Sequence, residues 1–170
     1  MPRRNRAAQL SWGLMLLDGH GTPRDLDAAF RWIQLSARAG GRDAANMLGR
    51  CHELGWGTPA NLTIAARCYR AAAEAGHAWA QFNLACLLLR EDGVPGDPTE
   101  ALTLLARSAR HGNAKAMNML GRCCEEGWRG PPKLAAARRW YLRAARGGCF
   151  RGAFHTARHL IVEGHIDKAI

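Results

Sequence analysis

The stretch AANMLGRCHELGWGTP at residues 44–59 decides the fold, because a close copy of it, AMNMLGRCCEEGWRGP, returns at residues 116–131. When the 36-residue segments that contain these stretches are aligned, they are identical at 18 positions. Self-similarity at a fixed interval is the sequence signature of a repeat protein. The two copies lie 72 residues apart, which is twice a shorter interval that runs through the whole chain.

This shorter interval is 36 residues, and four separate columns of residues keep it. The columns are Gly40, Gly76, Gly112 and Gly148; Gly13, Gly49, Ala85, Gly121 and Ala157; Ala29, Ala65, Ala101 and Ala137; and Pro23, Pro59, Pro95 and Pro131. We expect four full repeats, at residues 8–43, 44–79, 80–115 and 116–151, and a partial capping repeat at residues 152–170.

Each repeat is predicted to contain two helices. In the second repeat, apolar residues at helical spacing give the first helix one core-facing side, made of Met47, Leu48, Cys51 and Leu54. Gly55 suits a left-handed helix end, and Pro59 prevents the first helix from continuing into the second. The second helix is expected to run from Leu62 to Ala75 and to end at Gly76.

A single helix pair of this size cannot bury its apolar face, whereas stacked pairs share one continuous core. The predicted fold is therefore all-α, an α/α superhelical solenoid of about four and a half helix-turn-helix repeats in one domain over residues 1–170. Residues 166–170 could begin the second helix of the capping repeat. Trp12, Trp32 and Trp140 lie in core positions of the helical pattern, whereas Trp56 and Trp128 lie in the turns.

The pattern resembles the Sel-one-like repeat, a relative of the tetratricopeptide repeat. The matching residues of the second repeat are Ala44, Leu48, Gly49, Gly55, Gly57, Ala65, Tyr69, Ala72, Ala73 and Gly76. The fourth repeat matches through Ala116, Leu120, Gly121, Gly127, Ala137, Trp140, Tyr141, Ala144, Ala145 and Gly148. The chain departs from the family at the tyrosine column of the first helix. The resemblance implies an adaptor or scaffold, mostly without catalysis, and does not identify its partner.

In solenoids of this kind the first helices usually line the concave surface. Positions four and then three residues apart in the first helices share one face, and this face alternates between polar and largely apolar residues along the repeats. The candidate partner-binding residues on this face are Asn46, Arg50, Glu53, Phe82, Asn118, Arg122, Glu125, Phe154 and Arg158.

The chemistry of this face suits an extended peptide of a partner protein. An asparagine amide both donates to and accepts from a peptide backbone, and an arginine binds a carboxylate with two parallel hydrogen bonds. Phe82 and Phe154 would contact apolar side chains. The alternative is that Asn, Arg and Glu bond within helices and between repeats, and so fix the curvature of the solenoid.

A second functional hypothesis follows from the net charge of +10. Ten arginines lie in the predicted second helices, on the expected convex face: Arg31, Arg38, Arg67, Arg70, Arg107, Arg110, Arg138, Arg139, Arg143 and Arg146. They could bind nucleic acid or another polyanion, although they also serve solubility and no interleaved aromatic residues accompany them.

The third hypothesis is a redox- or metal-linked enzyme that uses the six cysteines at positions 51, 68, 86, 123, 124 and 149. We expect reduced and mostly buried thiols, because no pair recurs at a regular spacing within the repeats. No metal-binding, phosphate-binding or catalytic motif is evident, so we predict no cofactor, no metal and no enzymatic activity. The chain reads as cytoplasmic and bacterial, with no membrane segment; Ile161, Val162, Ile166 and Ile170 could form a self-association edge.

Overall fold

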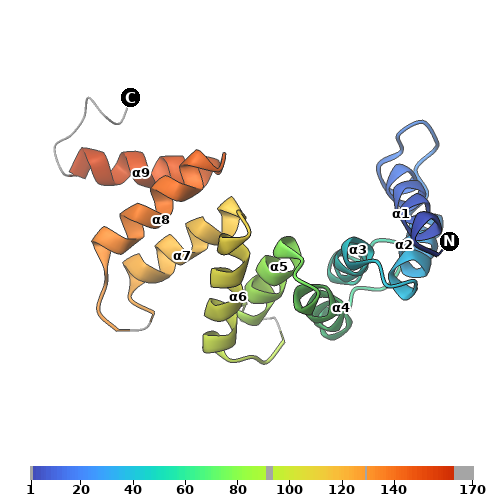
Figure 1. The fold of residues 1–170 in the computed structure, drawn as a ribbon, viewed down its shortest axis with the longest axis horizontal. Coiled ribbons are helices and arrows are strands. Elements are labelled where there is room, and N and C mark those ends of the chain that lie inside the picture. Colours follow the sequence, from blue (N-terminus) through green and yellow to red (C-terminus); the bar gives the residue numbers. More distant parts are fainter. Residues whose placement is uncertain (1, 91–93, 129, 163–170) are drawn as a thin grey trace. The chain divides into compact units, whose positions relative to one another are not determined.

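The computed structural model describes residues 2–90, 94–128 and 130–162, and all regular secondary structure in these ranges is α-helical (Figure 1). The chain divides into two compact units, residues 1–97 and 98–170. The first unit contains α1 (Pro2–Asp18), α2 (Leu26–Arg38), α3 (Arg42–Leu54), α4 (Leu62–Glu74) and α5 (Ala78–Leu88). The second contains α6 (Pro98–Arg110), α7 (Ala114–Glu126), α8 (Leu134–Arg146) and α9 (Phe150–Val162). The predicted all-α fold of paired helices is confirmed.

Helix ends follow the signals in the sequence. α3 is followed by the cap residue Gly55 and α7 by Gly127, with φ angles of +72° and +70°, in the left-handed region where a side chain causes strain. Two of the second helices begin at polar caps: the side chains of Asp25 and Asn61 accept hydrogen bonds from the backbone N–H groups of the first turns of α2 and α4. Asn113 caps α7 in the same way. These glycines and cap residues explain why the helix boundaries predicted from the sequence lie close to those in the structure.

Within each unit every helix packs on its successor in the chain. In the first unit the fully buried side chains include Ile33, Cys51, Tyr69, Leu84 and Leu87. In the second unit Tyr141, Leu105 and Ser108 are completely enclosed, and α7 also contacts α9. Within each unit, successive helices therefore share a core, as stacking in an α/α solenoid requires.

The column of small residues in the first helices makes room for large side chains of the second helices. A Cβ atom at Gly49 would lie 2.6 Å from the ring of Tyr69, and one at Gly121 would lie 2.5 Å from the ring of Tyr141. Both distances are far below van der Waals contact. In each of these repeats, glycine in the first helix is thus the complement of a buried tyrosine in the second.

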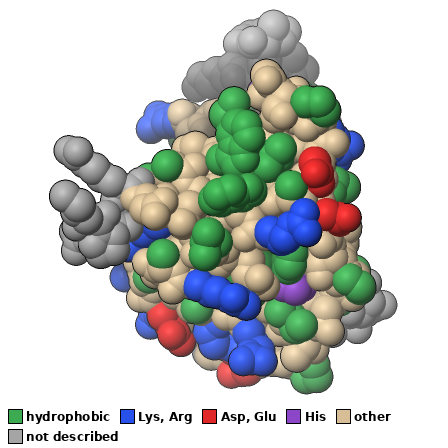
Figure 2. All heavy atoms as spheres, turned by 90° about the vertical axis from the view of Figure 1, so that its right-hand side faces the viewer, with side chains coloured by type: hydrophobic (Ala, Val, Ile, Leu, Met, Phe, Trp, Pro, Cys, Tyr) green, Lys and Arg blue, Asp and Glu red, His purple; other side chains and the backbone are tan. Residues whose placement is uncertain are grey.

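Some predicted core positions are wrong. Leu54 is 51% exposed, because the buried side of α3 is set by Ala44 and Gly49, small residues that let neighbouring helices approach, together with Cys51 and His52. Trp12 and Trp32 are 42% and 37% exposed. Figure 2 views the end of the molecule that carries α1 and α2, and hydrophobic side chains gather on its surface. Trp140 is half-buried.

The predicted capping repeat is described as far as Val162, where α9 ends. The proposed second helix at residues 166–170 lies outside the described residues, as do Ile166 and Ile170 of the suggested self-association edge. Ile161 and Val162 are exposed at the end of α9. None of the described helices has both the length and the apolar character needed to cross a membrane.

Candidate partner-binding site

Two glutamates of the predicted face are anchored by the buried tyrosines. The Tyr69 hydroxyl donates to Oε2 of Glu53 at 2.5 Å, and the Tyr141 hydroxyl donates to Oε2 of Glu125 at 2.6 Å. Burial, together with the neighbouring carboxylate, raises the pKa of both tyrosines. Each tyrosine therefore remains a neutral hydrogen-bond donor that holds its glutamate in a fixed position.

The same glutamates bridge to the next repeat. In the first unit Oε1 of Glu53 accepts a hydrogen bond from Arg90 at 3.3 Å, and Asn46 accepts one from the Asn83 amide at 3.0 Å. In the second unit Arg158 donates to Oε1 of Glu125. These contacts join consecutive first helices, so this face runs continuously from α3 to α5 in one unit and from α7 to α9 in the other.

The two asparagines differ in their partners. Asn46 and Asn118 are each only 7% exposed, but the side-chain oxygen of Asn118 accepts no hydrogen bond from the described residues. The hydrogen-bond partner of Asn46 is Asn83, which lies 37 residues later in the sequence. The residue 37 positions after Asn118 is His155 rather than an asparagine. The His155 ring stacks on Tyr141 with centroids 4.5 Å apart, and its buried Nδ1 atom has no hydrogen-bond partner among the described residues. A buried acceptor without a donor is energetically costly.

The arginines of the face also differ between the repeats. The Arg50 guanidinium lies over the Trp56 ring at 4.8 Å, and Trp56 packs against the cluster of Leu16, Leu17 and Ala29. In the fourth repeat Glu126 replaces Leu54, and its carboxylate accepts hydrogen bonds from both Arg122 and the Trp128 indole. Trp128 is 39% exposed. The turn tryptophan is thus a packing residue in the second repeat and a partly exposed one in the fourth.

The two phenylalanines of the face differ in their exposure to solvent. Phe154 is 59% exposed on α9, whereas Phe82 is half-buried on α5 with its ring edge-on to Trp79 at a centroid distance of 6.1 Å. Arg122 and Arg158 are exposed, and Arg50 is half-buried. The predicted residues therefore form two groups of neighbours, one in each unit.

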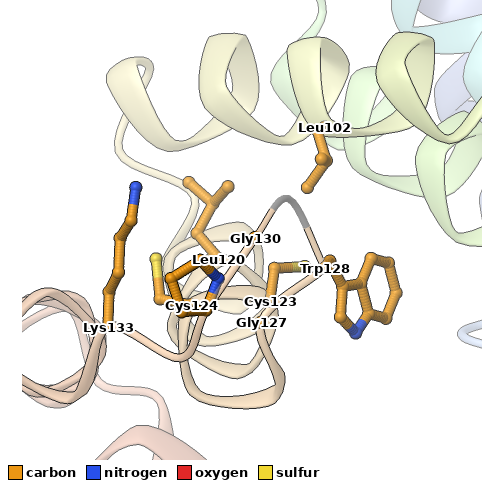
Figure 3. A pocket seen from close by; sticks show the side chains of 9 residues that line it. Leu102, Leu120, Cys123, Cys124, Gly127, Trp128, Gly130 and Lys133 are labelled. Carbon is orange, nitrogen blue, oxygen red and sulfur yellow. The ribbon is translucent and has the colours of Figure 1, made fainter.

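An apolar pocket of about 130 Å³ lies beside the turn of the fourth repeat. Its lining residues are Leu102, Leu120, Cys123, Cys124, Gly127, Trp128, Gly130, Pro131 and Lys133. Figure 3 shows Leu102 pointing from α6 toward this turn. The turn of the second repeat packs more tightly, since a Cβ at Gly57 would lie 2.1 Å from the Leu26 carbonyl oxygen.

Glu125 interacts with several polar and charged side chains of the second unit. Burial alone would raise the pKa of this carboxyl, but hydrogen bonds from Tyr141 and Arg158 lower it overall. Nε2 of His159 lies 3.3 Å from the same carboxylate, outside hydrogen-bond geometry. Burial, with Arg158 nearby, lowers the pKa of His155. A charged glutamate and a neutral histidine are therefore the states that the fold favours at neutral pH.

The cysteines show no catalytic arrangement in the part of the chain that is described. All six are free thiols, and burial raises the pKa of Cys51 to about 11 and that of Cys123 to about 12. Thiols in this state are poor nucleophiles. Among the described residues, no group of three His, Cys, Asp or Glu side chains is placed to hold a metal ion.

The sequence alone does not identify the residues whose hydrogen bonds hold the first-helix face in place. The sequence identifies Tyr69 and Tyr141 only as family matches, and it gives no signal for Asn83 or Arg90. The two tyrosines could have been found from their pairing with Gly49 and Gly121, since Tyr69 and Tyr141, like these glycines, lie 72 residues apart. The bridges between repeats, which join residues 33 or 37 positions apart, could not, because they depend on how helices stack.

The family model of the Sel1 repeat matches the chain four times, at residues 6–41, 42–77, 80–113 and 114–149. The chain is similar to the chitin synthase regulator SKT5 of Malassezia restricta, with 36% identity over 132 residues. This match covers 75% of the chain but only 9% of the regulator.

Two solved structures have a similar fold. A Sel1 repeat protein from Oxalobacter formigenes is 25% identical with a TM-score of 0.89, over 95% of this chain and 66% of that one. A protective antigen of uropathogenic Escherichia coli with an SLR fold is 32% identical with a TM-score of 0.79, over 91% of this chain and 33% of that one. The chain thus spans only part of these relatives. Its four matched repeats place it in the Sel1 repeat family.

Proposed function

We propose that the chain is a non-enzymatic scaffold that binds a partner protein or peptide on the face formed by its first helices. The observation that carries this proposal is the pair of exposed arginines on neighbouring first helices, Arg122 on α7 and Arg158 on α9, where Arg158 also binds Glu125 of α7. Their guanidinium groups would bind carboxylate or carbonyl oxygens of a bound peptide. Phe154, on the neighbouring helix α9, is exposed and would contact an apolar side chain of the same peptide.

The remaining candidate residues have two roles in this proposal. The residues that contact the partner in this proposal are Arg50, Phe82, Arg122, Phe154 and Arg158, whereas Asn118 is buried. The bridging residues Asn46, Glu53 and Glu125 set the spacing of the first helices and act through the residues beside them. The pocket next to Trp128 accepts a further apolar side chain.

Similarity supports a binding role rather than a catalytic one. The family consists of repeat scaffolds, and the curated relative is a regulator of another protein, chitin synthase. We assign to this chain only that general role, because the match covers 9% of the regulator.

The test compares two double variants of the chain as bait in a lysate of the source organism. Arg122→Ala with Phe154→Ala changes the proposed face, and Arg31→Ala with Trp32→Ala removes a matched arginine and aromatic residue from the exposed side of α2. We expect the first variant to lose a captured protein that the second retains at the wild-type level in quantitative mass spectrometry. Equal capture by both variants contradicts the proposal.

The polyanion alternative remains a second candidate, because nine of the ten arginines predicted on the second helices are exposed and Arg70 is half-buried. Its signature would be binding that weakens steeply with salt. An oligonucleotide arm in the experiment below separates this alternative from peptide binding.

A further inference from the structure

A second cavity, of about 350 Å³, lies between α6, α7 and α8 and is separate from the first-helix face. Its lining residues are Ala109, Arg110, Met117, Trp140, Arg143 and Arg146. The three arginines are exposed, whereas Met117 and Trp140 are half-buried. The cavity therefore combines an apolar base with a rim of guanidinium groups.

The rim carries positive charge that no carboxylate neutralises within residues 98–128 and 130–162. Between residues 98 and 162 the sequence has twelve basic residues and three acidic ones, Glu100, Glu125 and Glu126. Glu125 and Glu126 are bound by Arg158 and Arg122 on another face. Among the described residues, no carboxylate forms an ion pair with the arginines of the rim. Most of the chain's net charge of +10 thus belongs to this region.

The second repeat provides an internal comparison, because it shares half of its sequence with the fourth. The residues aligned with Arg110, Met117, Trp140, Arg143 and Arg146 are Arg38, Ala45, Cys68, Ala71 and Glu74. Four of the five positions differ, and the second repeat has small side chains and an acidic residue there. Shared folding requirements do not explain the cavity, since a similar repeat folds without these residues.

From this comparison we infer that the cavity binds an acidic peptide segment with a large apolar side chain, presented by a partner protein. Carboxylates of such a segment would receive paired hydrogen bonds from Arg110, Arg143 and Arg146. The apolar side chain would rest on Trp140 and on Met117, whose flexible thioether adapts to different shapes. This inference does not depend on the first-helix face.

A peptide suits the cavity better than a nucleic acid does. The Arg143 guanidinium already lies over the Trp140 ring, 5.3 Å from its centroid. That face of the ring is therefore not available to stack on a base, which is how aromatic residues bind single-stranded nucleic acids. An apolar side chain needs only contact with the ring edge and the thioether.

The test uses fluorescence anisotropy with the full chain and a labelled peptide of sequence EELFEE. The variant Arg143→Ala with Arg146→Glu introduces the residues of the second repeat, so the fold should tolerate it. The control variant Arg138→Ala with Arg151→Glu changes the net charge equally at positions outside the cavity. We expect binding about tenfold weaker for the cavity variant and less than about twofold weaker for the control.

Three results would overturn the inference. The first is an equal loss of affinity in both variants, which would indicate diffuse charge attraction. The second is equal binding of EELAEE, in which the phenylalanine is replaced, because the apolar base would then have no role. The third is tighter binding of a labelled hexauridylate than of the peptide, with the same dependence on Arg143 and Arg146, which would make the cavity a nucleic-acid site. Circular dichroism melts confirm that the variants are folded.

Discussion

The Tyr69 hydroxyl lies 2.5 Å from Oε2 of Glu53, and it reaches this carboxylate because Gly49 leaves room for the tyrosine ring against α3. The fourth repeat builds the same contact from Gly121, Glu125 and Tyr141. In both repeats a glutamate of the first-helix face is thus held from within the core. In the second and fourth repeats, the face and the core of this protein are linked by one tyrosine side chain.

Replacing Tyr141 with phenylalanine tests this link. The change removes the hydrogen bond but keeps the ring, and we expect the free energy of unfolding to fall by about 1–2 kcal/mol. Urea denaturation monitored by circular dichroism measures the effect. Tyr69→Phe should behave similarly, whereas unchanged stability in both variants would show that the two hydroxyls contribute nothing to folding.

Replacing Gly121 with alanine should destabilise the protein, although alanine normally favours a helix interior by about 0.5–1 kcal/mol. The new methyl group would collide with the Tyr141 ring, so we expect a loss of about 1–3 kcal/mol in urea denaturation. The control is Gly121→Ala combined with Tyr141→Leu, which introduces the residues found in the third repeat, Ala85 and Leu105. This double variant should be more stable than Gly121→Ala alone; failure to recover would locate the strain elsewhere.

Stability should fall as the solution becomes acidic, in two ranges of pH. Burial lowers the pKa of His155, so the stability that its neutral form gives is complete above the ordinary value of 6.5 and declines as pH falls toward the lower folded value. The lowered pKa of Glu125 gives stability above the ordinary value of 4.5, which is lost as pH falls through its folded value.

Urea denaturation between pH about 8 and about 5 measures the histidine contribution. We expect His155→Gln to reduce the loss of stability over this range, and His20→Gln, which changes an exposed turn residue, to leave it as in the wild type. Equal pH profiles for wild type and His155→Gln would exclude this role of His155.

The buried thiols should resist alkylation in the native protein. Because burial raises the pKa values of Cys51 and Cys123, iodoacetamide at pH about 8 should leave both unmodified until denaturant is added. The half-buried Cys149 serves as the comparison within the same sample. Peptide mass spectrometry identifies the labelled sites, and rapid native labelling of Cys51 or Cys123 would revive the hypothesis of cysteine chemistry.

Much of the fold could be predicted from the sequence because its repeats record the same local constraints several times. Gly55 and Gly127 mark left-handed helix ends, and each could be identified by comparison with the other. The exposure of Leu54 and Trp12 could not be predicted in this way. Helical spacing shows which residues share a side, but close approach of helices at small residues decides which side is buried.

Less of the site could be predicted, because its residues depend on neighbours in the next repeat. Asn46 and Asn118 occupy equivalent positions and are equally buried, yet only Asn46 has an amide partner on the following first helix. That difference arises from Asn83 and His155, which repeat alignment alone does not connect to the asparagines. The cavity between α6, α7 and α8 likewise combines residues from three helices.

The central claim, that the first helices bind the partner, is tested most directly by photo-crosslinking in cells of the source organism. Benzoylphenylalanine is placed at Phe82 and Phe154 on the first-helix face, and at Trp32 and Leu142, which are exposed on second helices. We predict that one protein is crosslinked from Phe82 and Phe154 and is absent from the other two samples. Crosslinks to a common partner from Trp32 and Leu142 alone would contradict the account.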